Sequence, residues 1–71
     1  MKEKVELADV FRRTSVRFAH IDRAKFDVLY HGWCRAGIRH GRNAQIYTTI
    51  RQRGWMSLRD AEDFERYIGL R

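Results

Sequence analysis

The chain contains very little cysteine and no proline: Cys34 is its only cysteine. One cysteine cannot form a disulfide within the chain, which excludes the disulfide-rich secreted scaffolds and suits a reducing cytoplasm. The absence of proline favours helices with short connections, because proline disrupts helix interiors. With 71 residues, we expect one domain over residues 1–71. A second copy in a homodimer would add stability to so small a core.

Long apolar runs are also missing. No segment reaches the roughly 20 consecutive apolar residues that span a bilayer. Residues 1–7 are rich in charge, and no apolar segment typical of a secretory signal follows them. We therefore expect a cytoplasmic protein without a membrane partner.

What the chain does contain is apolar side chains in quantity and an excess of positive charge. A hydrophobic content of 44% and an aromatic content of 13% favour a folded chain over a disordered one. The net charge of +6 favours a polyanionic partner such as nucleic acid. Only three of the 15 basic residues are lysines, and arginine makes planar, bidentate contacts to phosphates and guanine edges. A GC-rich genome would produce the same arginine bias, but the attraction to a polyanion follows in either case.

Apolar residues at helical spacing predict a small, compact, all-α bundle of three to four short helices. The clearest pattern is Phe26, Leu29, Tyr30 and Trp33, which fall at i, i+3, i+4 and i+7. Helices are predicted over residues 2–13, 23–36, 44–53 and 58–68. Two segments stay open: residues 16–21 fit a short β segment, a turn or a helix lead-in, and residues 46–50 also suit a strand because they are rich in β-branched side chains.

Polar residues and glycines predict where these helices begin and end. Asp22 is an N-cap candidate for the second helix and Gly37 its end. Asn43 is placed to cap the third helix, which Gly54 ends. Ser57 begins the fourth helix in a pattern that resembles a capping box. Residues 55 and 56 are then expected to pack between the third and fourth helices.

Charge is segregated along the chain. No acidic residue occurs from Val28 through Arg59. The same stretch holds two histidines and six arginines, namely Arg35, Arg39, Arg42, Arg51, Arg53 and Arg59. Four acidic residues then follow in the last predicted helix: Asp60, Glu62, Asp63 and Glu65. They form a solvated face, a negative charge bias that suits the N-terminal end of the helix, or intramolecular partners for the arginines.

The basic stretch predicts a small nucleic-acid-binding protein, with DNA favoured and a regulatory or accessory role. Arginines would hold phosphates, and amides and hydroxyls of the third helix would read base edges in a groove. The candidate residues are Arg35, Arg39, Arg42, Asn43, Gln45, Thr49, Arg51 and Arg53. An ordinary solvated helix surface would have similar polarity. The alternative function is a protein-binding module or inhibitor that docks this face on an acidic surface, with Trp55 as an anchor.

The order and charge of the predicted helices partly fit two known DNA-binding folds. In a helix-turn-helix, the second helix of the pair enters the groove. Here the helix after Gly54 is acidic and phosphate would repel it, so the third helix is the better candidate. A ribbon-helix-helix would use residues 16–21 as its ribbon and would have to be a dimer, but the spacing of the helices fits it poorly.

Metal binding and catalysis have little support in the sequence. His20, His31, Cys34 and His40 are ligand types for zinc, but they lack the paired spacings of a zinc finger. Cys34 equally fits a small buried apolar residue. No nucleophile has a base and an orienting group beside it. We therefore expect no cofactor, no metal and no enzymatic activity.

Overall fold

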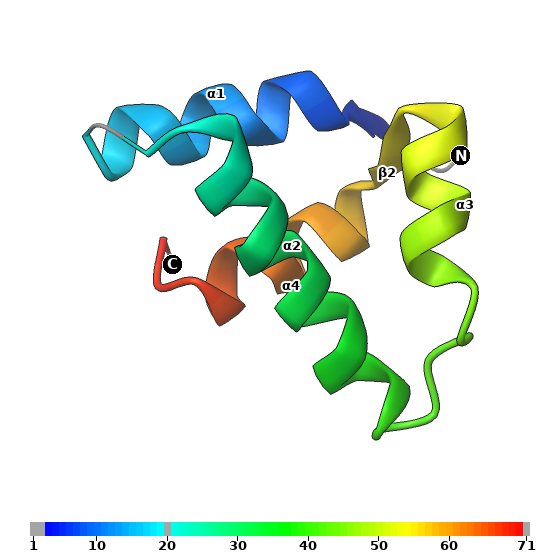
Figure 1. Ribbon diagram of the computed structural model, residues 1–71. Helices are drawn as coiled ribbons and strands as arrows, with labels where there is room; N and C mark the ends of the chain where they lie inside the picture. The colour runs from blue at the N-terminus through cyan, green and yellow to red at the C-terminus, as the bar shows by residue number, and fades with distance from the viewer. Residues whose placement is uncertain (1–2, 20, 71) are drawn as a thin grey trace.

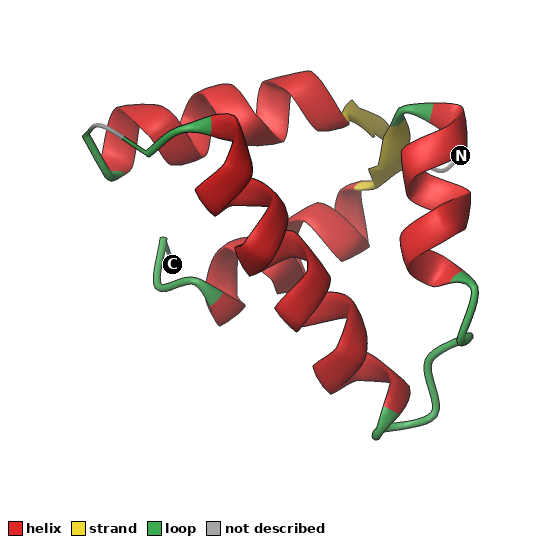
Figure 2. Cartoon of the chain, viewed as in Figure 1, coloured by secondary structure: helices red, strands yellow, loops and turns green. Residues whose placement is uncertain are grey.

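The computed structural model describes residues 3–19 and 21–70 of the chain. They form six elements: β1 (Lys4–Glu6), α1 (Leu7–Arg17), α2 (Arg23–Ile38), α3 (Ile46–Arg53), β2 (Trp55–Ser57) and α4 (Leu58–Tyr67). Helices make up most of the molecule, and two short strands lie side by side near the start of α1 (Figures 1 and 2). The prediction of a small, mostly helical bundle is confirmed.

The two strands form an antiparallel β ribbon that fastens the start of the chain to the α3–α4 connection. Its register pairs Lys4 with Ser57, Val5 with Met56, and Glu6 with Trp55. Side chains alternate along a strand, so the buried Met56 and its neighbour Val5 face the core. The other four residues lie on the outer face of the ribbon. Backbone hydrogen bonds continue the pairing at both ends, from Leu7 N–H to Gly54 O and from Leu58 N–H to Glu3 O.

Two details of the prediction for the start of the chain are wrong. The first helix begins at Leu7, because residues 4–6 are a strand paired with residues 55–57. A strand of three residues is too short to give a detectable alternation. The β alternative for residues 16–21 is wrong for the part that the structure describes, because α1 continues to Arg17 and residues 18, 19 and 21 belong to no strand; residue 20 lies outside the described residues. Thr14 lies inside the helix, and its buried hydroxyl donates to Val10 O at 2.8 Å.

Helix α2 is the central element of the core. Asp22 caps it as predicted, with Oδ1 accepting from Lys25 N–H at 2.8 Å. The predicted end at Gly37 is wrong, because the helix runs to Ile38. The chain turns afterwards, where Gly37 O accepts from both His40 N–H and Arg42 N–H and Gly41 adopts a φ of 91°. This turn places Arg42 back over the helix.

Helix α3 is a helix, as favoured, so the strand alternative for residues 46–50 is wrong. It begins at Ile46, two residues later than predicted. Asn43 is not its N-cap: Asn43 Oδ1 accepts from Gln45 N–H at 2.7 Å within the preceding turn. Gly54 ends the helix in the left-handed conformation, with a φ of 79°, as the sequence indicated.

Helix α4 begins at the predicted cap, where Ser57 Oγ accepts from Asp60 N–H at 3.1 Å. Helix α2 contacts each of the other three helices and crosses the middle of the molecule (Figure 1). The core is Leu7, Val10, Phe26, Tyr30, Trp33, Cys34, Ile50, Met56, Ala61 and Phe64. No helix among the described residues is both long enough and apolar enough to cross a membrane.

Candidate nucleic-acid interface

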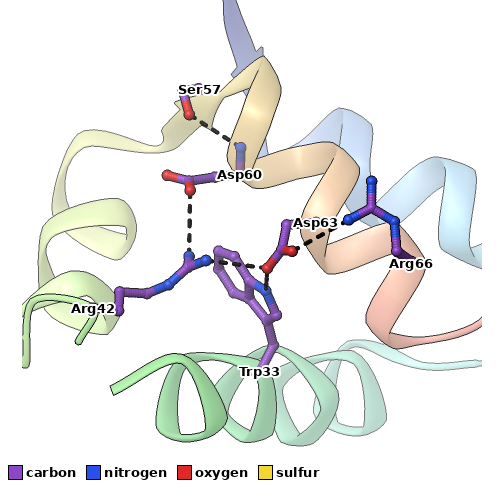
Figure 3. Close-up of polar contacts among 6 residues, drawn as sticks. All are labelled: Trp33, Arg42, Ser57, Asp60, Asp63 and Arg66. Carbon is purple, nitrogen blue, oxygen red and sulfur yellow. Dashed lines mark hydrogen bonds and ion pairs between the residues drawn. The ribbon is translucent and has the colours of Figure 1, made fainter. Parts of the chain in front are cut away.

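Arg42 lies over the core and pairs with α4. Its Nη1 is 3.3 Å from Asp60 Oδ1 and its Nη2 is 3.1 Å from Asp63 Oδ2 (Figure 3). The guanidinium also covers the indole of Trp33, with Cζ 4.2 Å from the ring centroid. Trp33 Nε1 donates to the same Asp63 Oδ2 at 2.8 Å. We call these four residues the Arg42 clasp. It neutralises Arg42 and joins the turn after α2 to α4.

Asp63 and Glu65 of α4 also contact further arginines of the chain. Asp63 Oδ1 lies 3.6 Å from Arg66 Nη1, one helical turn away. Glu65 is nearly buried and accepts from Arg13 Nε of α1 at 2.9 Å. The interpretation of the acidic helix as an intramolecular partner for arginines is therefore confirmed for these carboxylates. The consequence is that α4 contributes little free negative charge near the basic helices.

Arg35 is exposed on the last turn of α2, and Arg39, the C-cap residue, is exposed directly after it. Within the described part of the chain, neither guanidinium forms a hydrogen bond or an ion pair. They lie at the end of α2 that is far from the end of α3 and from β2 (Figure 1). The structure therefore does not bring Arg39 and Arg53 onto one patch, although both belong to the acid-free stretch.

The polar candidates lie at the start and on the outer face of α3. Asn43 and Gln45 are exposed in the turn before the helix, and Thr49 is exposed on it. At 100° per residue, Gln52 points opposite to the fully buried Ile50. Arg51 and Arg53 then fall on the two sides of Gln52. The helix thus presents an uncharged polar centre between two cationic edges.

Arg51 is held by an aromatic neighbour and not by a carboxylate. Its Nη1 donates to Tyr47 Oη at 3.3 Å, and its Cζ lies 5.9 Å from the Tyr47 ring centroid. The Tyr47 hydroxyl in turn donates to Asp27 Oδ1 of α2 at 3.2 Å. Arg51 is therefore positioned by the hydroxyl and the ring of Tyr47, and no carboxylate pairs with it among the described residues.

Arg53 is fixed more firmly, on the indole of Trp55. Its Cζ lies 3.8 Å from the ring centroid, and its Nε donates to Trp55 O at 2.8 Å. Lys4 Nζ of β1 lies 4.6 Å from the same centroid. We call Lys4, Arg53 and Trp55 the Trp55 platform. A cation–π contact holds a cation without cancelling its charge, so this platform displays two positive charges.

Trp55 does not pack in the core as the sequence predicts. The contact of Lys4 with Trp55 has no counterpart in the sequence-based prediction. Met56 is fully buried, whereas Trp55 is half-buried on the outer face of the ribbon. Lys4 lies 51 residues away in sequence, and only the pairing of β1 with β2 brings it to Trp55. Because that pairing left no pattern in the sequence, nothing pointed to Lys4.

The histidine and cysteine candidates do not converge. In residues 3–19 and 21–70, no group of three or more histidine, cysteine, aspartate or glutamate side chains could hold a metal ion. Burial raises the pKa of the Cys34 thiol to about 11, which keeps it protonated and unreactive at neutral pH. His31 is exposed and packs on the Tyr47 ring, with the centroids 4.7 Å apart. His40 is exposed in the turn after α2, and His20 lies outside the described residues.

Comparison with known proteins adds no functional information to this geometry. No protein-family model, no curated protein and no solved structure matches the chain.

Proposed function

We propose that the protein binds nucleic acid, with duplex DNA favoured, through the outer surface of α3 and the β ribbon. The observation that carries the proposal is the Trp55 platform, where Arg53 is immobilised by Trp55 at 3.8 Å and 2.8 Å but is not neutralised. Its Nε is engaged, which leaves the two terminal nitrogens for a phosphate. An arginine fixed in advance loses less side-chain entropy when it binds an oxyanion.

The contrast with Arg42 supports this assignment. Both arginines lie on a tryptophan, but two carboxylates neutralise Arg42 and none pairs with Arg53 among the described residues. Arg42 therefore stabilises the fold, and Arg53 is available to a partner. In this proposal Arg42 is a structural residue and not a nucleic-acid contact.

The outer face of α3 matches what a groove requires. Gln52 and Thr48 lie opposite the buried Ile50, and the two edges carry Arg51 and Arg53. A helix in a major groove places its edges near the two phosphate backbones and its centre near the bases. Thr49, Gln45 and Asn43 extend the polar surface toward the start of the helix. A DNA-binding regulatory or accessory protein of the cytoplasm fits this surface.

The test is fluorescence anisotropy with random duplex DNA and with RNA, at low and moderate salt. The test variant is Arg51→Gln/Arg53→Gln. The matched control is Arg17→Gln/Lys25→Gln, which removes the same charge from exposed cations at the α1–α2 corner. We expect the test variant to lose at least about tenfold in affinity and about two units of the log–log salt slope. The control should lose much less.

Two results would contradict the proposal. Equal losses in both variants would show attraction by net charge alone and no defined surface. No binding to either nucleic acid at low salt would reject nucleic acid as the partner.

A protein partner is the second candidate, and a separate surface favours it. Val28 is 71% exposed and Ile38 39% exposed on the outer side of α2, on either side of Arg35. Apolar side chains around a cation are typical of a protein-docking surface. Here an acidic protein face would be the partner. Affinity would then fall more on Val28→Ser/Ile38→Ser than with added salt.

A further inference from the structure

Tyr67 lies across α2 at Gly32, where a larger residue would crowd the tyrosine hydroxyl. A Cβ added to Gly32 would come within 3.0 Å of Tyr67 Oη. Gly32 lies inside α2, where glycine is less favourable than alanine. The ring that it admits is nevertheless half exposed, at 50%. The glycine therefore lowers the helix propensity of α2 but lets the half-exposed Tyr67 ring pack closely against the helix.

Two small concavities adjoin at this ring. The first, of ≈ 240 Å³, is lined by Gly32, Arg35, Ala36, Arg39 and Tyr67. The second, of ≈ 290 Å³, shares Ala36 and Tyr67 with the first and reaches Trp33 and Asp63. Both are smaller than the sites that enclose a drug-sized ligand, which begin at about 300 Å³. Each therefore has room for a fragment such as one heterocyclic ring or one phosphate.

The charges around the two concavities differ. Gly32, Arg35, Ala36 and Arg39 follow one face of α2 at i, i+3, i+4 and i+7, and no carboxylate lines the first concavity. Arg35 and Arg39 are like charges one turn apart, which repel each other unless an anion lies between them. The second concavity is lined by Asp63 and by Arg66, which lies 3.6 Å from Asp63 Oδ1, so it lacks the unpaired positive charge of the first. An anionic group therefore belongs on the side of Arg35 and Arg39.

We propose that this surface is a binding site for a single unpaired nucleotide. The base packs on the exposed ring of Tyr67, and the phosphate lies between Arg35 and Arg39. Aromatic rings accept any base by stacking, and paired guanidinium groups suit a phosphate. The concavities are too small for a duplex. The site shares no residue with the α3–ribbon surface, so it stands or falls independently of the proposed function.

The experiment is a titration of the ¹⁵N-labelled full chain with adenosine 5′-monophosphate, followed by amide chemical shifts. Adenosine and inorganic phosphate are titrated separately as the two halves of the ligand. We expect the nucleotide to shift the amides of residues 32–39 and 67, and to bind at least about fivefold more tightly than either half. No shift at these amides, or shifts only around Trp55, would overturn the proposal.

Variants separate a nucleotide site from a simple anion site. Tyr67→Leu and Arg35→Gln/Arg39→Gln should each weaken the nucleotide at least about fivefold, whereas Arg17→Gln on α1 should not. Gly32→Ala should displace the Tyr67 ring and weaken binding although the folded chain is retained, which excludes unfolding as the cause. Equal affinities for phosphate and nucleotide, unaffected by Tyr67→Leu, would reject the base contact. Tighter binding of a phosphotyrosine peptide would reject the nucleotide as the ligand class.

Discussion

Arg42 and Trp33 are stacked, with the guanidinium Cζ 4.2 Å from the indole centroid, and both donate to Asp63 Oδ2. The contact closes the turn after α2 over the core and ties it to α4 (Figure 3). The side chain of Arg42 is only 21% exposed. The clasp therefore has the features of a structural ion pair and not of a binding site.

We predict that Arg42→Ala lowers the free energy of unfolding by about 1 to 2 kcal/mol, because it removes both the indole contact and the ion pairs. The lower end applies if solvent screens Asp63, whose side chain is 45% exposed. Arg42→Lys should lower the free energy of unfolding nearly as much, since an ammonium group cannot make the planar contacts of a guanidinium. Urea denaturation measures both. Arg59→Ala is the control: Arg59 is exposed on α4, and its change should stay within about 0.5 kcal/mol. A clasp variant as stable as the control would contradict this prediction.

Asp63 both pairs with Arg42 and accepts a hydrogen bond from Trp33, and two substitutions distinguish the two interactions. It accepts the N–H of Trp33, a residue that is only 2% exposed. Asp63→Asn keeps an acceptor oxygen for the indole and loses the charge opposite Arg42. Asp63→Ala removes both the acceptor and the charge. The buried N–H of Trp33 is then left without an acceptor, which lowers the free energy of unfolding by about 1 to 3 kcal/mol. We therefore expect Asp63→Ala to unfold at a lower urea concentration than Asp63→Asn. Equal midpoints would show that the indole N–H finds water instead.

The two arginine–tryptophan pairs also predict different salt dependence. If the Trp55 platform binds phosphate, Arg53→Gln should reduce the log–log salt slope of DNA binding by about one unit. Arg42→Gln should leave the slope unchanged, because its charge is already neutralised by Asp60 and Asp63. Anisotropy titrations over a series of salt concentrations measure both slopes. A reduced slope for Arg42→Gln would place this guanidinium in contact with the nucleic acid after all.

Local patterns explain why much of the fold was predictable. Each of these patterns depends on residues close together in the sequence. The apolar stripe from Phe26 to Trp33 repeats every three to four residues, and Asp22 and Ser57 each cap a backbone N–H three residues further on. Patterns of this kind are visible in the sequence. The stop at Gly54 is equally local, since the left-handed φ of 79° favours glycine.

The rest of the fold depends on contacts between distant segments. The β ribbon pairs residues 4–6 with residues 55–57, and its three-residue strands show no period of their own. Contacts between distant segments also decide which arginines of the candidate site are neutralised. Arg42 and Arg53 are equivalent in sequence terms, both in an acid-free stretch, and only the tertiary fold places Arg42 on two carboxylates and Arg53 with Lys4. Charge counts along a chain cannot separate arginines that stabilise from arginines that are free.

Two glycines should respond in opposite ways to alanine. Gly54 has a φ of 79° and open space around its missing Cβ, so Gly54→Ala meets only backbone strain. We expect a loss of about 1 to 2 kcal/mol. Gly32 has a helical backbone, and the neighbour that a Cβ would meet is the end of the half-exposed Tyr67 side chain, which can move. Gly32→Ala should therefore be neutral or stabilising by up to about 1 kcal/mol. Thermal unfolding of the two variants checks the sign, and destabilisation by Gly32→Ala would show that the Tyr67 ring is rigidly held.

Alkaline conditions should destabilise the fold through buried groups that are neutral in the native state. Burial raises the pKa of Cys34 from 9.0 to about 11, and burial likewise raises the pKa of the Tyr30 hydroxyl, which donates to Tyr47 O at 2.7 Å. Between pH 9 and 11 the unfolded chain releases the Cys34 proton and the folded chain retains it. The unfolded state then binds fewer protons, so stability falls as pH rises through this window and is fully present below it.

Cys34→Ala should flatten that decline without abolishing it, because Tyr30 still contributes. Urea denaturation of both proteins at several values between neutral pH and pH 11 gives the two curves. The variant will start from a lower stability, since it leaves a small cavity in the core, so the slopes and not the absolute values are compared. Parallel curves would mean that the Cys34 thiol ionises equally easily in the folded and unfolded chain, and that it is more accessible to solvent than its 1% exposure indicates.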